Sequence, residues 1–256
     1  AQVGRVAAER AVAMLESQPA PSGEMPVVLW RGSGGVLFHE ACGHGLEGDF
    51  IVRDSSVYAG RRGERIASEL VNGVDDATVM NGWGSFAFDD EGTPASRTTL
   101  FEDGVLVDYL TDRRSSHRLG VGGSGNGRRQ SYAHLPIPRM TNTFILPGQG
   151  DPEEVLASVD RGVLCKQLGG GQVNEATGEF VFGMTEAYLI EGGEIVHAIR
   201  GANLVGHGPT ALADIDAVCG DLALWTGTCG KSGQMVPAGL GTPTLRISRI
   251  TIGGTA

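Results

Sequence analysis

Residues 25–49, MPVVLWRGSGGVLFHEACGHGLEGD, place an apolar run, a glycine-rich turn and a pair of histidines in direct succession. The run MPVVLW is typical of a short strand, and RGSGG is typical of a turn. Loops that follow strands carry much of the chemistry of enzymes. We therefore expect the histidine segment to form a helix that holds the functional site, directly after the strand and the turn.

The histidine segment resembles the zinc-protease motif H-E-x-x-H but contains one residue more. His39 and His44 are five residues apart, so a regular helix would turn their side chains about 140° from each other. A local π-type turn closes most of that angle, and Gly43 and Gly45 on either side of His44 favour such a turn. We therefore expect the helix to loosen here, so that both imidazoles reach one metal ion.

A metal site is one interpretation of this motif, and a core helix whose histidines hydrogen-bond to backbone groups is the other. Two neutral imidazoles leave a zinc ion in need of a third protein ligand and one open position for water. Glu40, beside the first histidine, is then placed to act as a general base that takes a proton from that water.

Five residues are candidates for the third ligand. Carboxylates near the motif can either bind the ion or orient a histidine, whereas a buried cysteine more often packs in the core. Cys229 lies in GTCGKSGQ, which we expect to be a flexible turn, and the nearby ammonium of Lys231 favours its thiolate form. The candidates are Cys42, Glu47, Asp49, Cys219 and Cys229.

The composition is typical of a globular protein that does not bind nucleic acid. The 256 residues carry a net charge of −10, whereas non-specific DNA binding requires a basic surface. Four cysteines do not make a disulfide scaffold in a chain of this length, and they fit a reducing compartment. No stretch approaches the length of a membrane span.

Local signals along the chain predict an α+β fold, mainly an antiparallel β-sheet domain with a few helices. We expect helices over 3–17, after Asp151 as N-cap, and over 208–219. Hairpins are predicted around Asp103-Gly104 and Gly192-Gly193, and single strands over 140–148 and 242–254.

Several longer blocks, taken in order, resemble the TldD branch of the TldD/PmbA family of metalloproteases. Together they are far more specific than the histidine motif alone, and the similarity extends from about residue 20 to the C-terminus. The blocks are GVLFHEACGHGLEGDF (35–50), FDDEGTP (88–94), SGNGRRQSYAHLPIPRMTNTFILPG (124–148), GGGQV (169–173), GDLAL (220–224) and CGKSGQMVPAGLGTPTLRISRITIGG (229–254).

The resemblance implies a zinc peptidase with one Zn²⁺ per chain, bound by His39, His44 and Cys229, and with Glu40 as general base. It implies that metal-bound hydroxide cleaves short or unfolded peptides, which bind as an added strand. Residues 21–256 would be the catalytic domain, and residues 1–20 a helix linking it to an N-terminal domain. The position of Cys42 is usually apolar in this family, which favours packing for that residue.

The resemblance also implies a cytoplasmic enzyme that forms a heterodimer with a homologous TldE/PmbA-like subunit lacking the metal motif. Direct contact with nucleic acid or a membrane is not expected. Two other functions remain open: a non-catalytic peptide-binding subunit with a structural or vacant metal site, and a metal-dependent amidase acting on small molecules. Glu40 favours the peptidase over the non-catalytic subunit, because a structural site has no use for an acid at that position.

Residues 113–139 form an arginine-rich loop in this otherwise acidic chain. The stretch has no acidic residue and six arginines, at positions 113, 114, 118, 128, 129 and 139. Arg128 or Arg129 is a candidate for binding a peptide carboxylate, and His134 and His207 are candidates for stabilising a tetrahedral intermediate. The alternatives are a solvated loop or a surface facing an acidic partner subunit, with histidines that only complete hydrogen-bond networks.

Overall fold

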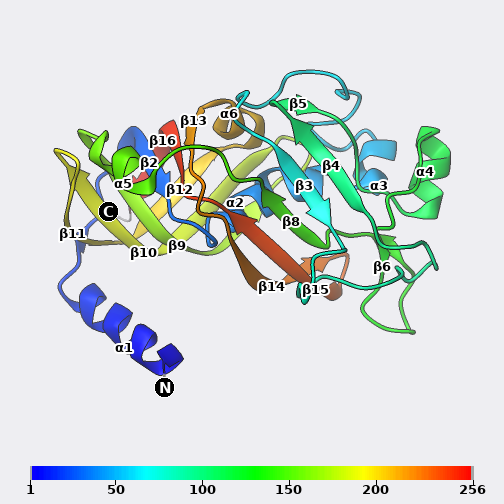
Figure 1. The fold of residues 1–256 in the computed structure, drawn as a ribbon, viewed down its shortest axis with the longest axis horizontal. Helices are drawn as coiled ribbons and strands as arrows, with labels where there is room; N and C mark the ends of the chain where they lie inside the picture. Colours follow the sequence, from blue (N-terminus) through cyan, green and yellow to red (C-terminus); the bar gives the residue numbers. More distant parts are fainter. Residues whose placement is uncertain (1, 255–256) are drawn as a thin grey trace.

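The histidine segment lies between two β-sheets in the computed structural model, which describes residues 2–254. Figure 1 shows one sheet on the side of the C-terminus and the other towards the opposite end, with α2 between them. Among the strands that the segment contacts, β8 belongs to one sheet, and β9 and β10 belong to the other. Burial between two sheets is what fixes the position of a helix as short as this one.

The first sheet closes on itself, because β10 pairs with β9 as well as with β12. Around this ring the strand order is β10-β12-β16-β2-β9, and only β2 and β9 are parallel. Its strands are β1 (Gln18–Pro19), β2 (Gly23–Leu29), β9 (Arg161–Val173), β10 (Glu179–Glu191), β11 (Glu194–Arg200), β12 (Ala202–His207), β13 (Ile215–Val218) and β16 (Leu245–Gly254).

The second sheet is open and has the order β14-β15-β8-β3-β4-β5, so that β14 lies at one edge. Its strands are β3 (Gly73–Asp76), β4 (Arg97–Glu102), β5 (Val105–Leu106), β8 (Asn142–Ile145), β14 (Ala223–Lys231) and β15 (Gln234–Thr242), while β6 (Gly127–Arg128) and β7 (Ile137–Pro138) form a separate pair. The helices are α1 (Gln2–Leu15), α2 (Gly35–Phe38), α3 (Gly48–Val52), α4 (Arg113–Leu119), α5 (Pro152–Ala157) and α6 (Gly208–Ala213).

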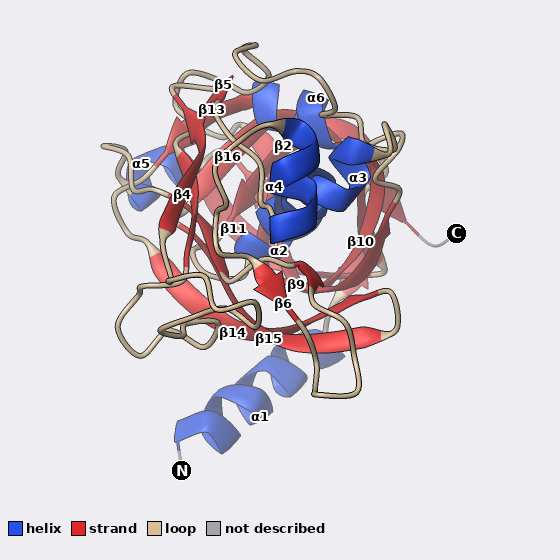
Figure 2. Cartoon of the chain, turned by 90° about the vertical axis from the view of Figure 1, so that its right-hand side faces the viewer, coloured by secondary structure: helices blue, strands red, loops and turns tan. Residues whose placement is uncertain are grey.

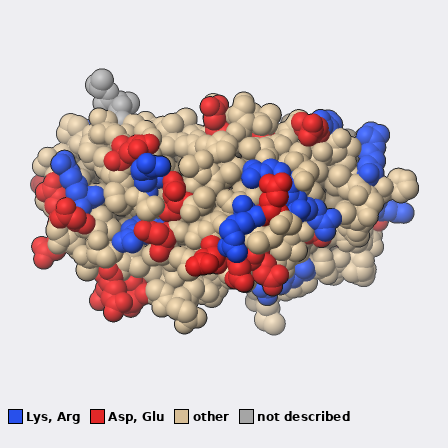
Figure 3. Space-filling model, turned by 90° about the horizontal axis from the view of Figure 1, so that it is seen from above, with Lys and Arg blue, Asp and Glu red and all other residues tan. Residues whose placement is uncertain are grey.

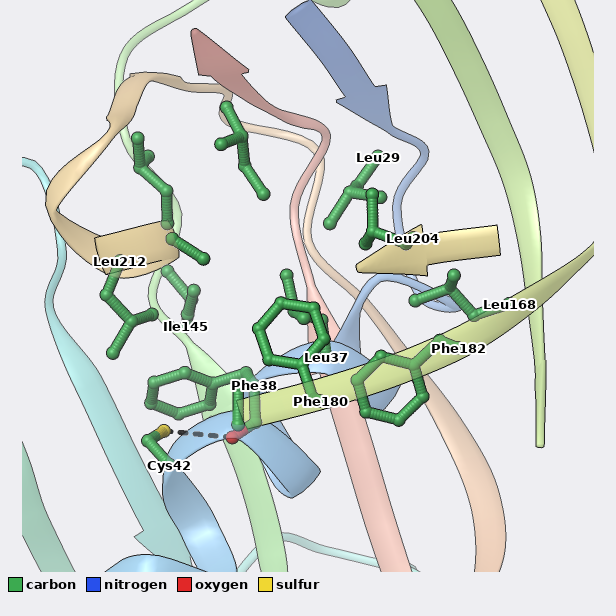
Figure 4. Close-up of a cluster of buried hydrophobic side chains, with 14 of the residues drawn as sticks. Leu29, Leu37, Phe38, Cys42, Ile145, Leu168, Phe180, Phe182, Leu204 and Leu212 are labelled. Atoms are coloured by element: carbon green, nitrogen blue, oxygen red, sulfur yellow. Dashed lines mark hydrogen bonds between the residues drawn. The ribbon is translucent and has the colours of Figure 1, made fainter. Parts of the chain in front are cut away.

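The largest hydrophobic core forms around α2. Leu37 of this helix lies on the side of Phe180 and Phe182 of β10, whereas Phe38 extends towards Phe101 of β4, with ring centroids 6.3 Å apart (Figure 4). All of these side chains are buried. At the start of the helix, Gly35 lies so close to β15 that a Cβ atom would come within 2.3 Å of the backbone nitrogen of Gly241. The absence of a side chain at residue 35 is therefore what lets the helix pack directly on the second sheet.

The predicted fold class is confirmed, and so are most of the elements that have strong local signals. Asp151 accepts hydrogen bonds from the backbone N–H groups of Glu153 and Glu154 at the start of α5. Both hairpins turn where expected, with Asp103-Gly104 between β4 and β5 and Gly192-Gly193 between β10 and β11. The helix predicted over 208–219 ends at Ala213, and β13 follows it.

Two predictions about loops are wrong. Cys229 does not lie in a flexible turn but on β14, which pairs along its whole length with β15. Glycines at 227 and 230 hide the alternation of buried and exposed residues by which a strand is recognised. The arginine-rich stretch is not simply a loop, because residues 113–119 form α4 and two short strands follow.

Helix α1 has no buried residue and contacts the first sheet through Arg10, whose guanidinium lies 2.6 Å from Glu186 of β10 (Figure 1). Its role as a link to another domain stays a prediction. Among the described residues, no helix is both long enough and apolar enough to cross a membrane.

Replacing Gly35 with Ala should lower the free energy of unfolding by about 1–3 kcal/mol, because the added methyl group meets the backbone of Gly241 and forces α2 off the sheet. Urea unfolding measures the change. Gly4→Ala in α1 is the matched control: its Cβ meets nothing within 4 Å, and the change should be neutral or stabilising by up to about 1 kcal/mol. Equal stability of the two variants would contradict the close packing.

Candidate metal centre

The helix that carries the two histidines changes its winding at the motif. Residues His39–Gly43 form one π-helical turn, and His44–Leu46 follow as a 3₁₀ turn. The backbone N–H of His44 donates to the carbonyl of His39, which is the five-residue hydrogen bond of a π-helix. The expected loosening between the histidines is therefore confirmed.

Glycine at position 43 allows this turn to pack tightly. A Cβ atom there would lie 2.1 Å from the sulfur of Met140, which is fully buried beside β8. The wide turn and its close packing together bring the two imidazole rings to a centroid distance of 5.1 Å, at an angle of 88°.

The thiol of Cys229 lies against both imidazoles. Its sulfur is 3.2 Å from Nε2 of His39 and 3.4 Å from Nε2 of His44, and all three side chains are buried. The three candidate ligand atoms lie within 4.8 Å of one another. The structure thus brings these three residues together, and no other group of three or more potential metal ligands is found among the described residues.

The geometry of this cluster fits a zinc ion. Zinc–nitrogen bonds of about 2.05 Å and zinc–sulfur bonds of about 2.3 Å in a tetrahedral site imply nitrogen–sulfur distances of about 3.5 Å. The two measured distances, 3.2 and 3.4 Å, are close to this value. Two imidazoles and one thiolate are also ligands that zinc prefers, and they leave one position of a tetrahedron for water.

The electrostatics favour a thiolate at residue 229. Burial by itself would raise the pKa of the Cys229 thiol, but the charge and hydrogen bonds of His39 and His44 lower this pKa to about 5. Burial tends to lower the pKa of both histidines, but the net effect is a raised pKa for each. The Cys229 thiolate raises the pKa of His39, and Glu47 together with the thiolate raises that of His44. A negative charge held between two imidazoles is well suited to bind a divalent cation.

Glu47 holds the ring of His44 from the side opposite to the cluster. Its Oε2 lies 3.0 Å from Nδ1 of His44, and the Nε2 of the same ring faces Cys229. The carboxylate is fully buried; burial opposes its charge, but Lys231 and His44 lower its pKa to about 2. Of the two roles considered for Glu47, orientation of a histidine is the one that its position fits.

Lys231 has a different role from the one expected. Its ammonium nitrogen lies 2.9 Å from Glu47 and 2.6 Å from Asp49, so it forms ion pairs with two carboxylates. The imidazoles, rather than this ammonium, lower the pKa of Cys229. Asp49 is thereby occupied by Lys231 and does not reach the cluster.

Arg139 is a residue that the sequence did not single out from the other arginines of its stretch. Its guanidinium is fully buried and donates hydrogen bonds to the carbonyls of Cys229 and Gln234, at the two ends of the β14–β15 turn. Its Nε lies 3.9 Å from Oε1 of Glu47. One side chain therefore connects the strand that carries the thiolate to the carboxylate that holds His44.

Glu40 lies at the edge of the cluster. Its Oε2 is 3.8 Å from Nε2 of His44, and about a third of its side chain is exposed, in contrast to the buried cluster. A carboxylate in this position can exchange protons with water that enters beside the histidines.

The remaining cysteines lie elsewhere. Cys42 is fully buried and donates to the carbonyl of Phe38 (Figure 4), and burial raises its pKa well above the usual range. Cys219 packs in a second hydrophobic cluster with Val28 and Val155. Within residues 2–254, neither thiol bonds the imidazoles or joins their group of candidate ligands, and packing accounts for both.

The four predicted substrate-binding residues are held by other partners. Arg128 is buried and donates to the carbonyl of Met140, Arg129 lies 3.6 Å from Asp90, His134 bonds Ser131, and His207 bonds Thr210. Within residues 2–254, none of their hydrogen bonds or ion pairs reaches the cluster. Their contact with a substrate stays a prediction.

The sequence as a whole matches one family. The model of the PmbA/TldA metallopeptidase C-terminal domain matches residues 22–254. Similar proteins include a Haemophilus influenzae protein named metalloprotease TldD homolog, which is 48% identical over 97% of this chain and 52% of its own length. A Saccharolobus solfataricus protein named zinc metalloprotease TldD homolog is 31% identical over 96% of this chain and 55% of its own length. The chain thus spans about half the length of these relatives.

Solved structures with the same fold also belong to longer chains. A Thermotoga maritima protein proposed to modulate a DNA gyrase aligns with a TM-score of 0.82 and 25% identity, covering 98% of this chain and 55% of its own. TldE from Thermococcus kodakarensis aligns with a TM-score of 0.78 and 23% identity, covering 98% and 55%. This second likeness establishes the fold alone.

Replacing Cys229 with Ser should reduce the zinc content from near one ion per chain to a small fraction, because a serine hydroxyl does not ionise to replace the thiolate. Inductively coupled plasma mass spectrometry on the dialysed protein measures it. Cys42→Ser is the matched control, because Cys42 is also buried but lies outside the cluster. Its thiol donates to the carbonyl of Phe38, which a serine hydroxyl can do as well. A full complement of zinc in Cys229→Ser would exclude this sulfur as a ligand.

Replacing Arg139 with Met should lower the free energy of unfolding of the metal-free protein by about 3 kcal/mol, because two buried carbonyls lose their donor and Glu47 loses a neighbouring cation. Arg161→Met removes an exposed arginine that pairs loosely with Glu191, and should cost less than about 1 kcal/mol. If urea unfolding gives similar values for both variants, Arg139 does not connect the strand and the helix as described.

Proposed function

Because this chain belongs to the family of the PmbA/TldA metallopeptidase C-terminal domain, we propose that it is a zinc-dependent peptidase that hydrolyses short or unfolded peptides. The observation that carries the proposal is the approach of the Cys229 sulfur to Nε2 of both His39 and His44, with the Glu40 carboxylate beside them. These residues supply three candidate metal ligands and a base, the groups that metal-assisted hydrolysis commonly uses.

The protein's own groups would divide the work as follows. His39, His44 and Cys229 would hold the ion, and Glu47 would fix the His44 ring through Nδ1. A bound zinc ion supplies a Lewis acid that polarises the peptide carbonyl and lowers the pKa of water. Glu40 would take the proton of the attacking water on its carboxylate and deliver it to the leaving amine.

A purely structural metal site agrees less well with these residues. Structural zinc sites usually have four protein ligands, whereas the cluster found in residues 2–254 has three. The carboxylate of Glu40 is also partly exposed and lies 3.8 Å from Nε2 of His44, so water can reach this carboxylate next to a proposed ligand atom. Both features favour a catalytic site over a structural one.

The position of Cys229 on an edge strand supports an extended peptide as substrate. Among the described strands, β14 pairs with β15 alone, so its other edge has no strand partner and could receive an added strand. The indole of Trp83, a half-exposed side chain, donates a hydrogen bond to the carbonyl of Gly227 on this strand. An unfolded peptide can present the free backbone that such pairing needs, and a folded protein cannot.

We further propose a cytoplasmic heterodimer with a homologous TldE/PmbA-like subunit that lacks the metal motif. All four cysteines are free and buried, and a metal-binding thiolate is preserved best in a reducing compartment. The fold shared with TldE supports a homologous partner.

Replacing Glu40 with Gln should lower the hydrolysis rate by at least about 100-fold, because the amide cannot accept a proton from water. The zinc content should stay near one per chain, because residue 40 is not one of the three proposed ligands. Mass spectrometry of products from an unstructured peptide measures the rate, and a small amide substrate in parallel separates a peptidase from an amidase. Glu194→Gln, on the exposed part of β11, is the control with unchanged rate. Full activity of Glu40→Gln would remove this residue from the mechanism.

A further inference from the structure

The arginines of residues 113–139 have two different fates in the fold. Arg128 and Arg139 are buried and bond backbone carbonyls, and Arg129 pairs with Asp90. The other three, Arg113, Arg114 and Arg118, are exposed on α4. The sequence cluster is therefore not one site, and its surface part requires a separate explanation.

Helix α4 presents these arginines from a well-fixed backbone. At its start, the carboxylate of Asp112 accepts hydrogen bonds from the N–H and the hydroxyl of Ser115. At its end, Gly120 adopts a left-handed conformation and donates to the carbonyl of Ser116. The helix buries Ser115 and Ser116, so its charged residues lie on the outer face.

The guanidinium groups of these three arginines form no ion pair with a described carboxylate, although Glu91 lies near Arg113. In the part of the chain that the structure describes, no carboxylate lies within 4.0 Å of their guanidinium groups. The nearby acids are already engaged, since Asp112 caps the helix and Glu91 accepts the backbone N–H of Arg113. Asp49 is bound by both Lys231 and Arg53.

Two hollows flank these arginines. One, of about 290 Å³, combines Arg53, Arg114 and Arg118 with an apolar wall formed by residues 135–138, and Asp49 and Asp112 also line it. The other is broader and contains Arg113, Arg114, His117 and Arg118, with Glu91 at its side. Leu135 of the apolar wall is 82% exposed and is therefore accessible to an apolar side chain of a ligand.

This surface lies at one end of the molecule and connects to the metal centre. Figure 2 shows α4 and α3 together at that end, surrounded by strands, and Figure 3 shows Lys and Arg side chains along the same end. Asp49 lines the smaller hollow and shares Lys231 with Glu47, the residue that holds His44. A chain bound in the hollow therefore lies a few side chains from the proposed ligands.

We propose that this α4 surface, defined as Arg53, Arg113, Arg114, His117, Arg118 and the wall 135–138, binds acidic stretches of peptide substrates. Side-chain carboxylates of the peptide pair with the free arginines, and a neighbouring apolar residue packs on the wall. The proposal rests on the peptidase function and names the class of substrate that it prefers.

An acidic peptide suits the surface better than a nucleic acid does. The apolar wall offers contact to an aliphatic side chain of a peptide, which the charged phosphate backbone of a nucleic acid does not have. Each exposed arginine–carboxylate pair contributes little, so three such pairs together should strengthen binding about tenfold.

The test measures binding to the zinc-free protein, so that it does not depend on hydrolysis. Two fluorescein-labelled unstructured peptides are compared by anisotropy at 50 mM salt: one contains three Glu and two Leu residues, and the other has Gln in place of Glu. The wild type should bind the Glu peptide about tenfold more tightly, and high salt should remove the difference. The double variant Arg114→Gln/Arg118→Gln should lose the preference.

Two control variants separate charge from folding. Arg114→Lys/Arg118→Lys keeps the charge and should keep most of the preference. Arg161→Gln/Arg249→Gln removes two exposed arginines from the first sheet, each 3.9 Å from a glutamate carboxylate. This variant should leave the preference for the Glu peptide unchanged. A loss of preference in this second control would show that only net charge matters and would overturn the proposal.

Other results would also overturn it. Equal affinity of the wild type for both peptides excludes an acid-specific surface. Tighter binding of a single-stranded oligonucleotide, with the same dependence on Arg114 and Arg118, assigns the surface to nucleic acid. A change of mass in light scattering on Arg114→Gln/Arg118→Gln assigns it to contact between copies of the chain. The two proposals can fail separately. If the wild type prefers the Glu peptide as expected but Glu40→Gln retains full hydrolysis, the role of Glu40 is excluded and the binding role of the α4 surface is retained.

Discussion

The hydrogen bond from the N–H of His44 to the carbonyl of His39 is the constraint on which the centre depends. A regular helix would direct the two imidazoles to different faces, and the π-turn places both beside one sulfur atom. A wide turn of this kind is intrinsically less stable than a regular one. Here it is held because its residues are buried between two sheets, and because Gly43 lets the turn pack directly on Met140.

The charges around the turn are balanced in pairs. The thiolate of Cys229 is stabilised by imidazoles on one side, and the carboxylate of Glu47 by Lys231 and Arg139 on the other. An isolated buried charge would cost several kcal/mol, so none of these groups is tolerated without its neighbours. The result is a network that joins β14 to the histidine helix, with His44 between its two parts. Such a network fixes the positions of the ligands more firmly than hydrophobic packing alone.

The need of buried charges for partners also distinguishes two groups of arginines, one buried and one on the surface. Arg128 and Arg139 donate to backbone carbonyls near the centre, whereas the guanidinium groups on α4 form no ion pair within residues 2–254. Three such arginines beside an apolar wall form a surface suited to an acidic partner. The two ends of the arginine-rich stretch thus contribute to different properties of the molecule.

The sequence by itself determined the elements whose signals are local. The cap at Asp151, the glycine turns and the irregular helix at the histidines follow from residues within a few positions of one another. The fold class and the family followed as well, since the blocks that carry them are continuous in the chain. Of the five candidates for the third ligand, the chemistry of the side chains alone left all of them open.

Only the tertiary structure decided which candidate lies beside both imidazoles. Cys229 is 185 residues from His44, and its approach depends on the pairing of β14 with β15 and of β15 with β8. No local pattern records such pairing, because glycines hide the alternation of β14. The same holds for Arg139, whose sequence neighbours do not distinguish it from exposed arginines. Long-range strand pairing and burial set these positions, and both are properties of the whole fold.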